Sequence, residues 1–73
     1  MIKNIVKNVA EKTHFNEDGK DIKAFDYLVN LAAKLTSETG NKHVIERVLD
    51  YTDFHNGEPR YNYSFDLIEL IDE

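Results

Sequence analysis

The chain has 73 residues, no cysteine and a formal net charge of −5, with 41% hydrophobic and 32% charged residues. This length leaves room for one small domain, and the composition is typical of a globular chain rather than a disordered or fibrous one. The lack of cysteine excludes disulfides and thiolate chemistry, and the sequence shows neither a signal peptide nor the ~20 apolar residues of a membrane helix. We expect a cytoplasmic domain that packing or a partner stabilises.

The first expected element is a short amphipathic helix at the amino terminus. Ile2, Ile5, Val6 and Val9 are spaced at i, i+3, i+4 and i+7, which is the spacing of one helix face. Several of these residues are β-branched, and two lysines lie near the start of the segment, where the helix dipole disfavours cations. An amino-terminal strand is therefore the alternative.

A polar segment and a long helix follow. Residues 14–20 are rich in polar residues and contain Asp-Gly, so they predict a loop. Residues 22–38 contain neither Gly nor Pro and predict a helix that ends at Gly40, with Asp21 or Asp18 as its amino-terminal cap. Apolar residues cover more than half of this helix, so either the first helix and a sheet or a second molecule should cover its two sides.

The last third of the chain predicts an antiparallel β-hairpin. Residues 61–67 alternate aromatic or apolar side chains with polar ones, which is typical of a half-buried strand. Residues 43–54 would suit either a strand or a helix. The Asn56-Gly57 pair between the two segments is a strong hairpin signal and favours a strand.

A three-residue loop with Gly57 in the left-handed region sets an expected register for this hairpin. The register places Glu46 opposite Asp66, although like charges on directly opposite residues are destabilising. It also pairs the residues of an apolar face that could pack on the long helix: Tyr51 with Tyr61, Leu49 with Tyr63, Arg47 with Phe65, and Ile45 with Leu67.

The predicted fold is therefore α+β, with a short amino-terminal helix and a long apolar helix packed on a carboxy-terminal antiparallel hairpin. All 73 residues belong to a single small domain. Charge is unevenly distributed along this domain. Residues 1–42 contain seven Lys and six acids, whereas residues 43–73 contain two Arg and eight acids. The hairpin and the tail thus carry all of the net negative charge.

These acids are the candidate partner-binding residues. They lie in the hairpin and in the residues that follow it: Glu46, Asp50, Asp53, Glu58, Asp66 and Glu69. Carboxylates on alternate strand positions, roughly 6.6–6.8 Å apart, form a row of negative charge as a phosphate backbone does. We expect a non-catalytic protein-binding module, an inhibitor that presents an acidic hairpin to a basic, nucleic-acid-handling partner protein.

Two other interpretations remain open. The acids could simply keep an exposed strand face soluble and prevent edge pairing. The protein could also be a structural or regulatory homodimer whose interface is the surplus apolar surface of the long helix. The composition, rich in Lys, Asn, Ile and Tyr, is similar to that of many small phage and mobile-element proteins.

Other classes of site are disfavoured. Residues 16–19 are similar to part of a calcium loop, but His14 and Phe25 occupy the first and twelfth positions, where oxygen ligands are needed. The three histidines lie in separate segments, which disfavours a zinc site. The chain lacks a phosphate loop and a nucleophile motif, so we expect neither an enzyme nor a cofactor. Without clustered Lys and Arg, direct binding to nucleic acid is also disfavoured.

Overall fold

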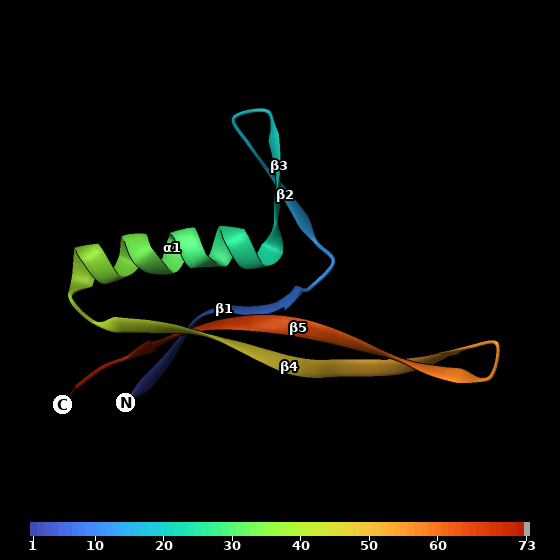
Figure 1. Cartoon of the computed structure of the whole chain (residues 1–73). Helices are drawn as coiled ribbons and strands as arrows, with labels where there is room; N and C mark the ends of the chain where they lie inside the picture. Colours follow the sequence, from blue (N-terminus) through green and yellow to red (C-terminus); the bar gives the residue numbers. More distant parts are fainter. Residues whose placement is uncertain (73) are drawn as a thin grey trace.

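The computed structural model describes residues 1–72, which form one helix and five strands in two antiparallel sheets (Figure 1). The elements in chain order are β1 (Ile2–Ala10), β2 (His14–Glu17), β3 (Lys20–Lys23), α1 (Ala24–Thr39), β4 (Lys42–His55) and β5 (Glu58–Leu70). β5 is the central strand of a sheet with the order β1-β5-β4, and β2 pairs with β3 alone. The predicted α+β class and carboxy-terminal hairpin are confirmed.

The amino-terminal segment is the strand β1, so the predicted short helix is wrong. β1 pairs with β5, and an irregularity in the register lies on each side of Val6. Val6 is opposite Leu67 and Val9 is opposite Phe65, so three residues of β1 span two residues of β5. Asn8 lies in this bulge with φ 58, a region that Asn tolerates better than most residues. The extra residue in the bulge places Val6 and Val9, which are three residues apart, on the same side of the sheet. This spacing is also that of residues on one helix face.

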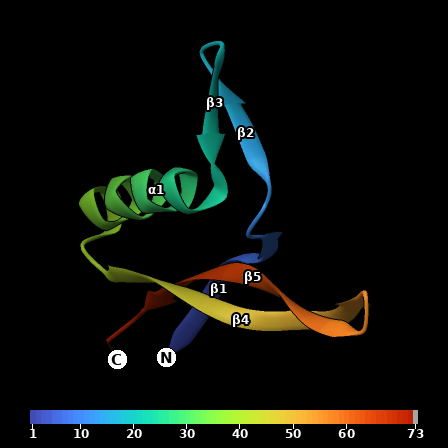
Figure 2. The same ribbon diagram turned by 45° about the vertical axis from the view of Figure 1, so that its right-hand side comes forward.

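Residues 14–20, predicted as a loop, instead form β2, the turn and the start of β3, and this hairpin stands at the amino-terminal end of α1 (Figure 2). Asp18 and Gly19 are the two central residues of its turn and have φ angles of 54° and 78°. Positive φ at both positions is typical of the tight turns that join short antiparallel strands. Phe15 of β2 stacks on Tyr27 of α1, with ring centroids 4.1 Å apart. The hairpin is thereby attached to the helix.

α1 agrees with the predicted long helix within one or two residues at each end. It ends before Gly40, as predicted, and Gly40 has φ 79° and donates its backbone N–H to the carbonyl of Thr36. The predicted cap at Asp21 or Asp18 is wrong. Lys23 occupies the cap position without a side-chain hydrogen bond, because Asp21 pairs within the small hairpin and Asp18 forms its turn.

The turn between β4 and β5 has two residues rather than the expected three. His55 pairs with Glu58, so Asn56 and Gly57 are the central residues, with φ angles of 52° and 81°. These angles match the turn that an Asn-Gly pair favours. The hairpin prediction is therefore confirmed, and the expected loop length is wrong.

A bulge in β4 compensates for the shorter turn. The register shifts by one residue between Leu49 and Tyr51, so Tyr51 lies opposite Asn62 and not opposite Tyr61. From Leu49 toward the start of β4 the pairs are those predicted, including Glu46 with Asp66. The expected register had a turn one residue too long and lacked the bulge in β4. These two one-residue errors offset each other, so the pairs from Leu49 toward the start of β4 are correct.

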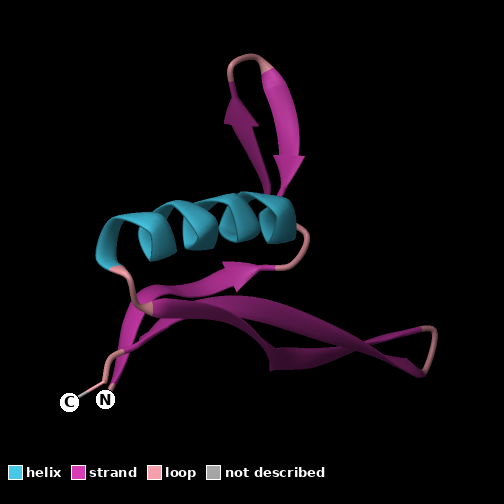
Figure 3. Ribbon diagram, turned by 60° about the vertical axis from the view of Figure 1, so that its left-hand side comes forward, coloured by secondary structure: helices cyan, strands magenta, loops and turns pink. Residues whose placement is uncertain are grey.

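The core lies between α1 and the large sheet and is small (Figure 3). Ala24 and Leu28 of α1 are buried against Phe65 and Leu67 of β5. Partly buried apolar side chains from β1, β2, α1 and β4 surround this cluster. Phe25, at 49% exposure, and other apolar residues of α1 are not covered. The expected second cover of the helix is missing because the segment predicted as a first helix is instead an edge strand of the sheet.

Candidate functional site

The sheet face opposite α1 is open (Figure 1). Side chains alternate along β5, so residues 65 and 67 face α1 whereas residues 64, 66 and 68 face the other side. The register places five of the predicted acids on this open side of β4 and β5. We call these five residues the acidic face: Glu46, Asp50, Asp53, Glu58 and Asp66.

Glu46 and Asp66 lie at the centre of the acidic face. They are directly opposite each other, and Glu46 is exposed. Within residues 1–72, no ion pair includes either carboxylate. Asp66 Oδ1 accepts a hydrogen bond of 2.9 Å from the backbone N–H of Asn8, the bulge residue of β1. The bulge thus stabilises one carboxylate of a like-charged pair without neutralising it.

The bulge in β4 keeps a third carboxylate on this face. Ser64, which is 2% exposed, donates its hydroxyl hydrogen bond of 3.2 Å to Asp50 Oδ2. Because Ser64 faces away from α1, the Asp50 carboxylate lies on the same side. This position brings Asp50 near the pair of Glu46 and Asp66, since Ser64 is two residues from Asp66 on β5.

Cations on the open side of β4 and β5 lie at its two ends. Arg60 Nε is 3.4 Å from Asp53 Oδ1, an ion pair whose geometry leaves that oxygen without a hydrogen bond. Lys42 is opposite Leu70 at the start of β4. The central carboxylates therefore lie between the two cations along the strands and contact neither of them.

Arg47 does not neutralise the acidic face, because it lies on the α1 side of the sheet. Its guanidinium binds both carboxylate oxygens of Glu11, with Nε to Oε2 at 2.6 Å and Nη2 to Oε1 at 3.3 Å. It also lies 3.7 Å from the ring centroid of Tyr63. The hydrogen bond from Arg47 holds the pKa of the Glu11 carboxyl below its ordinary value. The sequence carries no local signal for this contact, which joins Glu11, the residue that follows β1, to β4 across the central strand.

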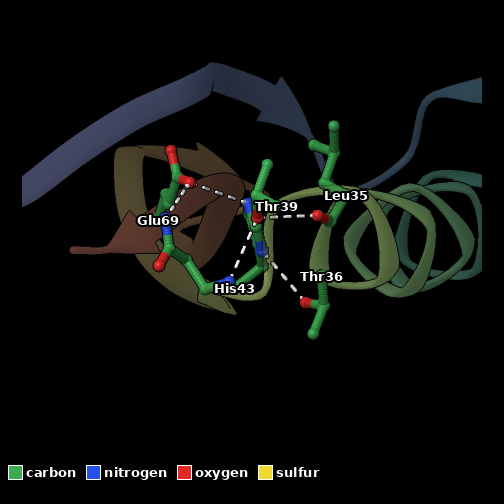
Figure 4. Close-up of polar contacts among 6 residues, drawn as sticks. Leu35, Thr36, Thr39, His43 and Glu69 are labelled. Carbon is green, nitrogen blue, oxygen red and sulfur yellow. Dashed lines mark hydrogen bonds and ion pairs between the residues drawn. The ribbon is translucent and has the colours of Figure 1, made fainter. Parts of the chain in front are cut away.

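The sixth predicted acid, Glu69, is not part of the acidic face. It is 6% exposed and lies on the α1 side, as the alternation with Leu67 requires. Asn41 Nδ2 donates a hydrogen bond of 2.9 Å to Glu69 Oε2, and His43 Nε2 is 3.8 Å from the same oxygen (Figure 4). A partner on the open face cannot reach this carboxylate.

Glu69 belongs instead to a buried polar network at the end of α1. The His43 side chain is 1% exposed, and its Nδ1 lies 2.9 Å from the hydroxyl oxygen of Thr36 (Figure 4). A hydroxyl, an imidazole and a carboxylate in this order have the residue types of a nucleophilic triad. A recess of about 60 Å³ lies elsewhere, beside Ala10, Tyr51 and the other residues at the start of β5, and is far smaller than the ~300 Å³ of a small-molecule site. The contacts of the network join the end of α1 to β4 and β5.

Among residues 1–72, no three His, Cys, Asp or Glu side chains are arranged to hold a metal ion. The described part of the chain also has no helix with the length and apolar character needed to cross a membrane.

Comparisons with known proteins do not place this chain in a family. No protein-family model matches it, and no curated protein or solved structure is significantly similar to it.

Proposed function

We propose that this protein is a non-catalytic protein-binding module that presents the acidic face to a basic partner protein. The partner is a protein that handles nucleic acid, and the module inhibits it by occupying the surface that binds the phosphate backbone. Five carboxylates on one open sheet face support this proposal. Charge complementarity of this kind speeds association and selects the partner.

The pair of Glu46 and Asp66 carries the argument. Two carboxylates on directly opposite residues of a sheet destabilise the fold, and neither carboxylate here has a cation as a partner. Arg47, which follows Glu46 in the sequence, lies on the other side of the sheet. A basic partner would remove this repulsion, so the free protein holds a charge arrangement that is more favourable in a complex.

The test is to neutralise the central carboxylates without changing their shape. In the variant Glu46→Gln, Asp50→Asn, Asp66→Asn, the amide oxygens can still accept the hydrogen bonds from Ser64 and Asn8. We expect the fold to stay intact, or to gain a few tenths of a kcal/mol from the lost repulsion. Capture of the partner from a lysate of the source cells should weaken tenfold or more at low salt, about 1.4 kcal/mol.

A matched control removes the same amount of charge elsewhere. The variant Glu17→Gln, Asp21→Asn, Glu38→Gln changes three exposed acids outside the acidic face and should capture the partner as the wild type does. The captured protein should be basic, and duplex DNA should compete with the module for it. If the acidic-face variant captures the same protein equally well, the carboxylates have a structural role and the proposal is wrong.

A further inference from the structure

The molecule exposes more surface than a compact monomer of its size. Its accessible surface is 5512 Å², whereas a compact protein of 8.5 kDa exposes about 4,650 Å². Its radius of gyration is 14.6 Å, compared with about 11 Å for a compact chain of this length. The excess surface of about 860 Å² is close to the ~800 Å² that each partner buries in a standard protein interface.

An arm formed by residues 51–62 of β4, the turn and β5 is largely uncovered. β1 pairs with β5 between Ser64 and Leu70, so the arm is a two-stranded ribbon that projects beyond the third strand (Figure 1). Every residue of the arm except Asp53 and Asn62 is exposed. A two-stranded ribbon of this kind is marginally stable in water.

The two faces of the arm differ in chemistry. On one face Thr52 lies opposite Tyr61 and Phe54 lies opposite Pro59. We call these four residues the aromatic row, which continues the alternation that buries Phe65 in the core. All four are uncharged, and the side chains of Phe54 and Tyr61 are 72% and 58% exposed. The other face of the arm belongs to the acidic face.

α1 covers the sheet but does not extend over the arm (Figures 1 and 3). At its amino-terminal end Phe25 lies 5.5 Å from Phe65, measured between ring centroids, and remains 49% exposed. The aromatic row of the arm lies beyond this last aromatic contact. It therefore lacks the apolar layer that the helix provides for the rest of the sheet.

We infer that the protein is a homodimer in which the arms of two copies pack face to face through their aromatic rows. A two-fold axis makes such an interface self-complementary, because each copy offers the same row to the other. β-layers pack about 10 Å apart, so the arm of the second copy would form the apolar layer that α1 does not supply. Phe25 lies at the border of this interface.

The charge distribution leaves the aromatic row as a surface through which two copies can approach. Each copy has a net charge of −5, so two copies repel each other and associate only through a surface without carboxylates. The aromatic row is uncharged, and the acidic face of each arm points away from the partner arm. The excess surface of the whole molecule is enough for one interface of standard size, to which the aromatic row and Phe25 would contribute. The acidic faces stay accessible, so this inference does not depend on the proposed function.

The mass of the protein in solution tests the inference. Interfaces of standard size have dissociation constants from micromolar to picomolar, so a dimer should be populated at about 100 μM protein. Light scattering should give twice the monomer mass at low salt and also at about 1 M salt, where charges are screened within ~3 Å. The variant Phe54→Thr, Tyr61→Thr should give the monomer mass. Threonine retains strand propensity, and both positions are exposed in the monomer.

The matched control is Val48→Thr, Tyr51→Thr, which replaces two exposed apolar residues on the opposite side of the same hairpin. It should remain a dimer. A monomeric wild type at this concentration would overturn the inference, as would a dimer that the control variant dissociates and the aromatic-row variant does not. If the aromatic-row variant is unfolded by circular dichroism, the wild type still decides the question, because the melting temperature of a dimer rises with protein concentration.

Discussion

The Glu11 carboxylate and the Arg47 guanidinium form the shortest ion pair in the described chain, at 2.6 Å. Both side chains are partly exposed, at 37% and 53%, so the pair stabilises the fold only modestly. The hydrogen bond lowers the pKa of Glu11 and raises the pKa of Arg47. The lowered pKa gives this contact a dependence on pH that can be measured.

A carboxyl whose pKa is lowered by folding stabilises the native state above its unfolded pKa, about 4.3 for Glu. This stabilisation is lost as the pH falls through the lower folded pKa of Glu11. We expect the wild type to have a larger free energy of unfolding than Glu11→Gln at pH 7, and this difference should shrink as the pH falls below about 4. Urea unfolding at several pH values measures it.

The control for this experiment is Glu17→Gln, which removes an exposed carboxylate that has no contact with Arg47. Its free energy of unfolding should stay close to that of the wild type at pH 7. A difference between wild type and Glu11→Gln that is the same at pH 7 and at pH 3 would show that the ion pair does not stabilise the fold.

The buried network of His43 gives a second prediction for single residues. Replacing His43 by Ala leaves the buried Glu69 carboxylate with Asn41 as its remaining partner and creates a void under the end of α1. We expect His43→Ala to lower the free energy of unfolding by about 1–3 kcal/mol. Thr36→Val removes an exposed hydroxyl from the same network and should cost less. Equal stability of His43→Ala and wild type would mean that the network is not structural.

Among the candidate binding residues, Glu69 lies on a side of the sheet that the alternation of side chains along β5 could have predicted. The period that directs Phe65 and Leu67 toward the helix directs Glu69 there as well. Charge by itself groups Glu69 with the other acids of the hairpin. Its burial depends on Asn41 and His43, which lie far away in the sequence and carry no local signal for this contact.

At the level of elements, the turn of the long hairpin gives a prediction about Gly57. A β-carbon added at this glycine would meet no atom within 4 Å, so the cost of a substitution is conformational. Its φ of 81° strains a β-branched residue, so Gly57→Val should destabilise the hairpin by about 1 kcal/mol or more. Gly57→Asn is the control, because Asn tolerates the left-handed region.

Hydrogen exchange of the arm is the suitable measurement for this change. The arm has two strands and can open without the rest of the sheet, so its amides should exchange faster in Gly57→Val than in Gly57→Asn. Amides of β1 and of the paired part of β5 should change less. Unchanged exchange in the arm would contradict the assignment of the turn.

β1 shows why an element type can be misjudged from periodicity. The spacing of Ile2, Ile5, Val6 and Val9 fits a helix face, yet the segment is a strand with two bulges. Each bulge adds a residue and shifts the alternation, so Val6 and Val9, three residues apart, lie on the same side of the sheet, whereas Ile2 is 64% exposed and does not join the core. The β-branched composition favours a strand, but the position of a bulge depends on contacts such as that between Asn8 and Asp66.

For the molecule as a whole, the two sides of the sheet differ in chemistry. The α1 side holds the core and continues into the aromatic row of the arm, whereas the open side carries the acidic face. The flat shape, with extents of 48 × 35 × 11 Å, leaves both surfaces accessible. The proposed dimer and the proposed complex with a basic partner use opposite faces and are therefore compatible.

The sequence by itself determined the long helix with its end at Gly40, the turn at Asn56 and Gly57, and the pairing of Glu46 with Asp66. These features depend on local backbone preferences and on the period of side chains along one element. Tertiary structure alone decided the bulges of β1 and β4, the burial of Glu69 and the extension of the arm beyond the third strand. These features depend on which distant strands pair and where that pairing stops, and neither is encoded in a local pattern.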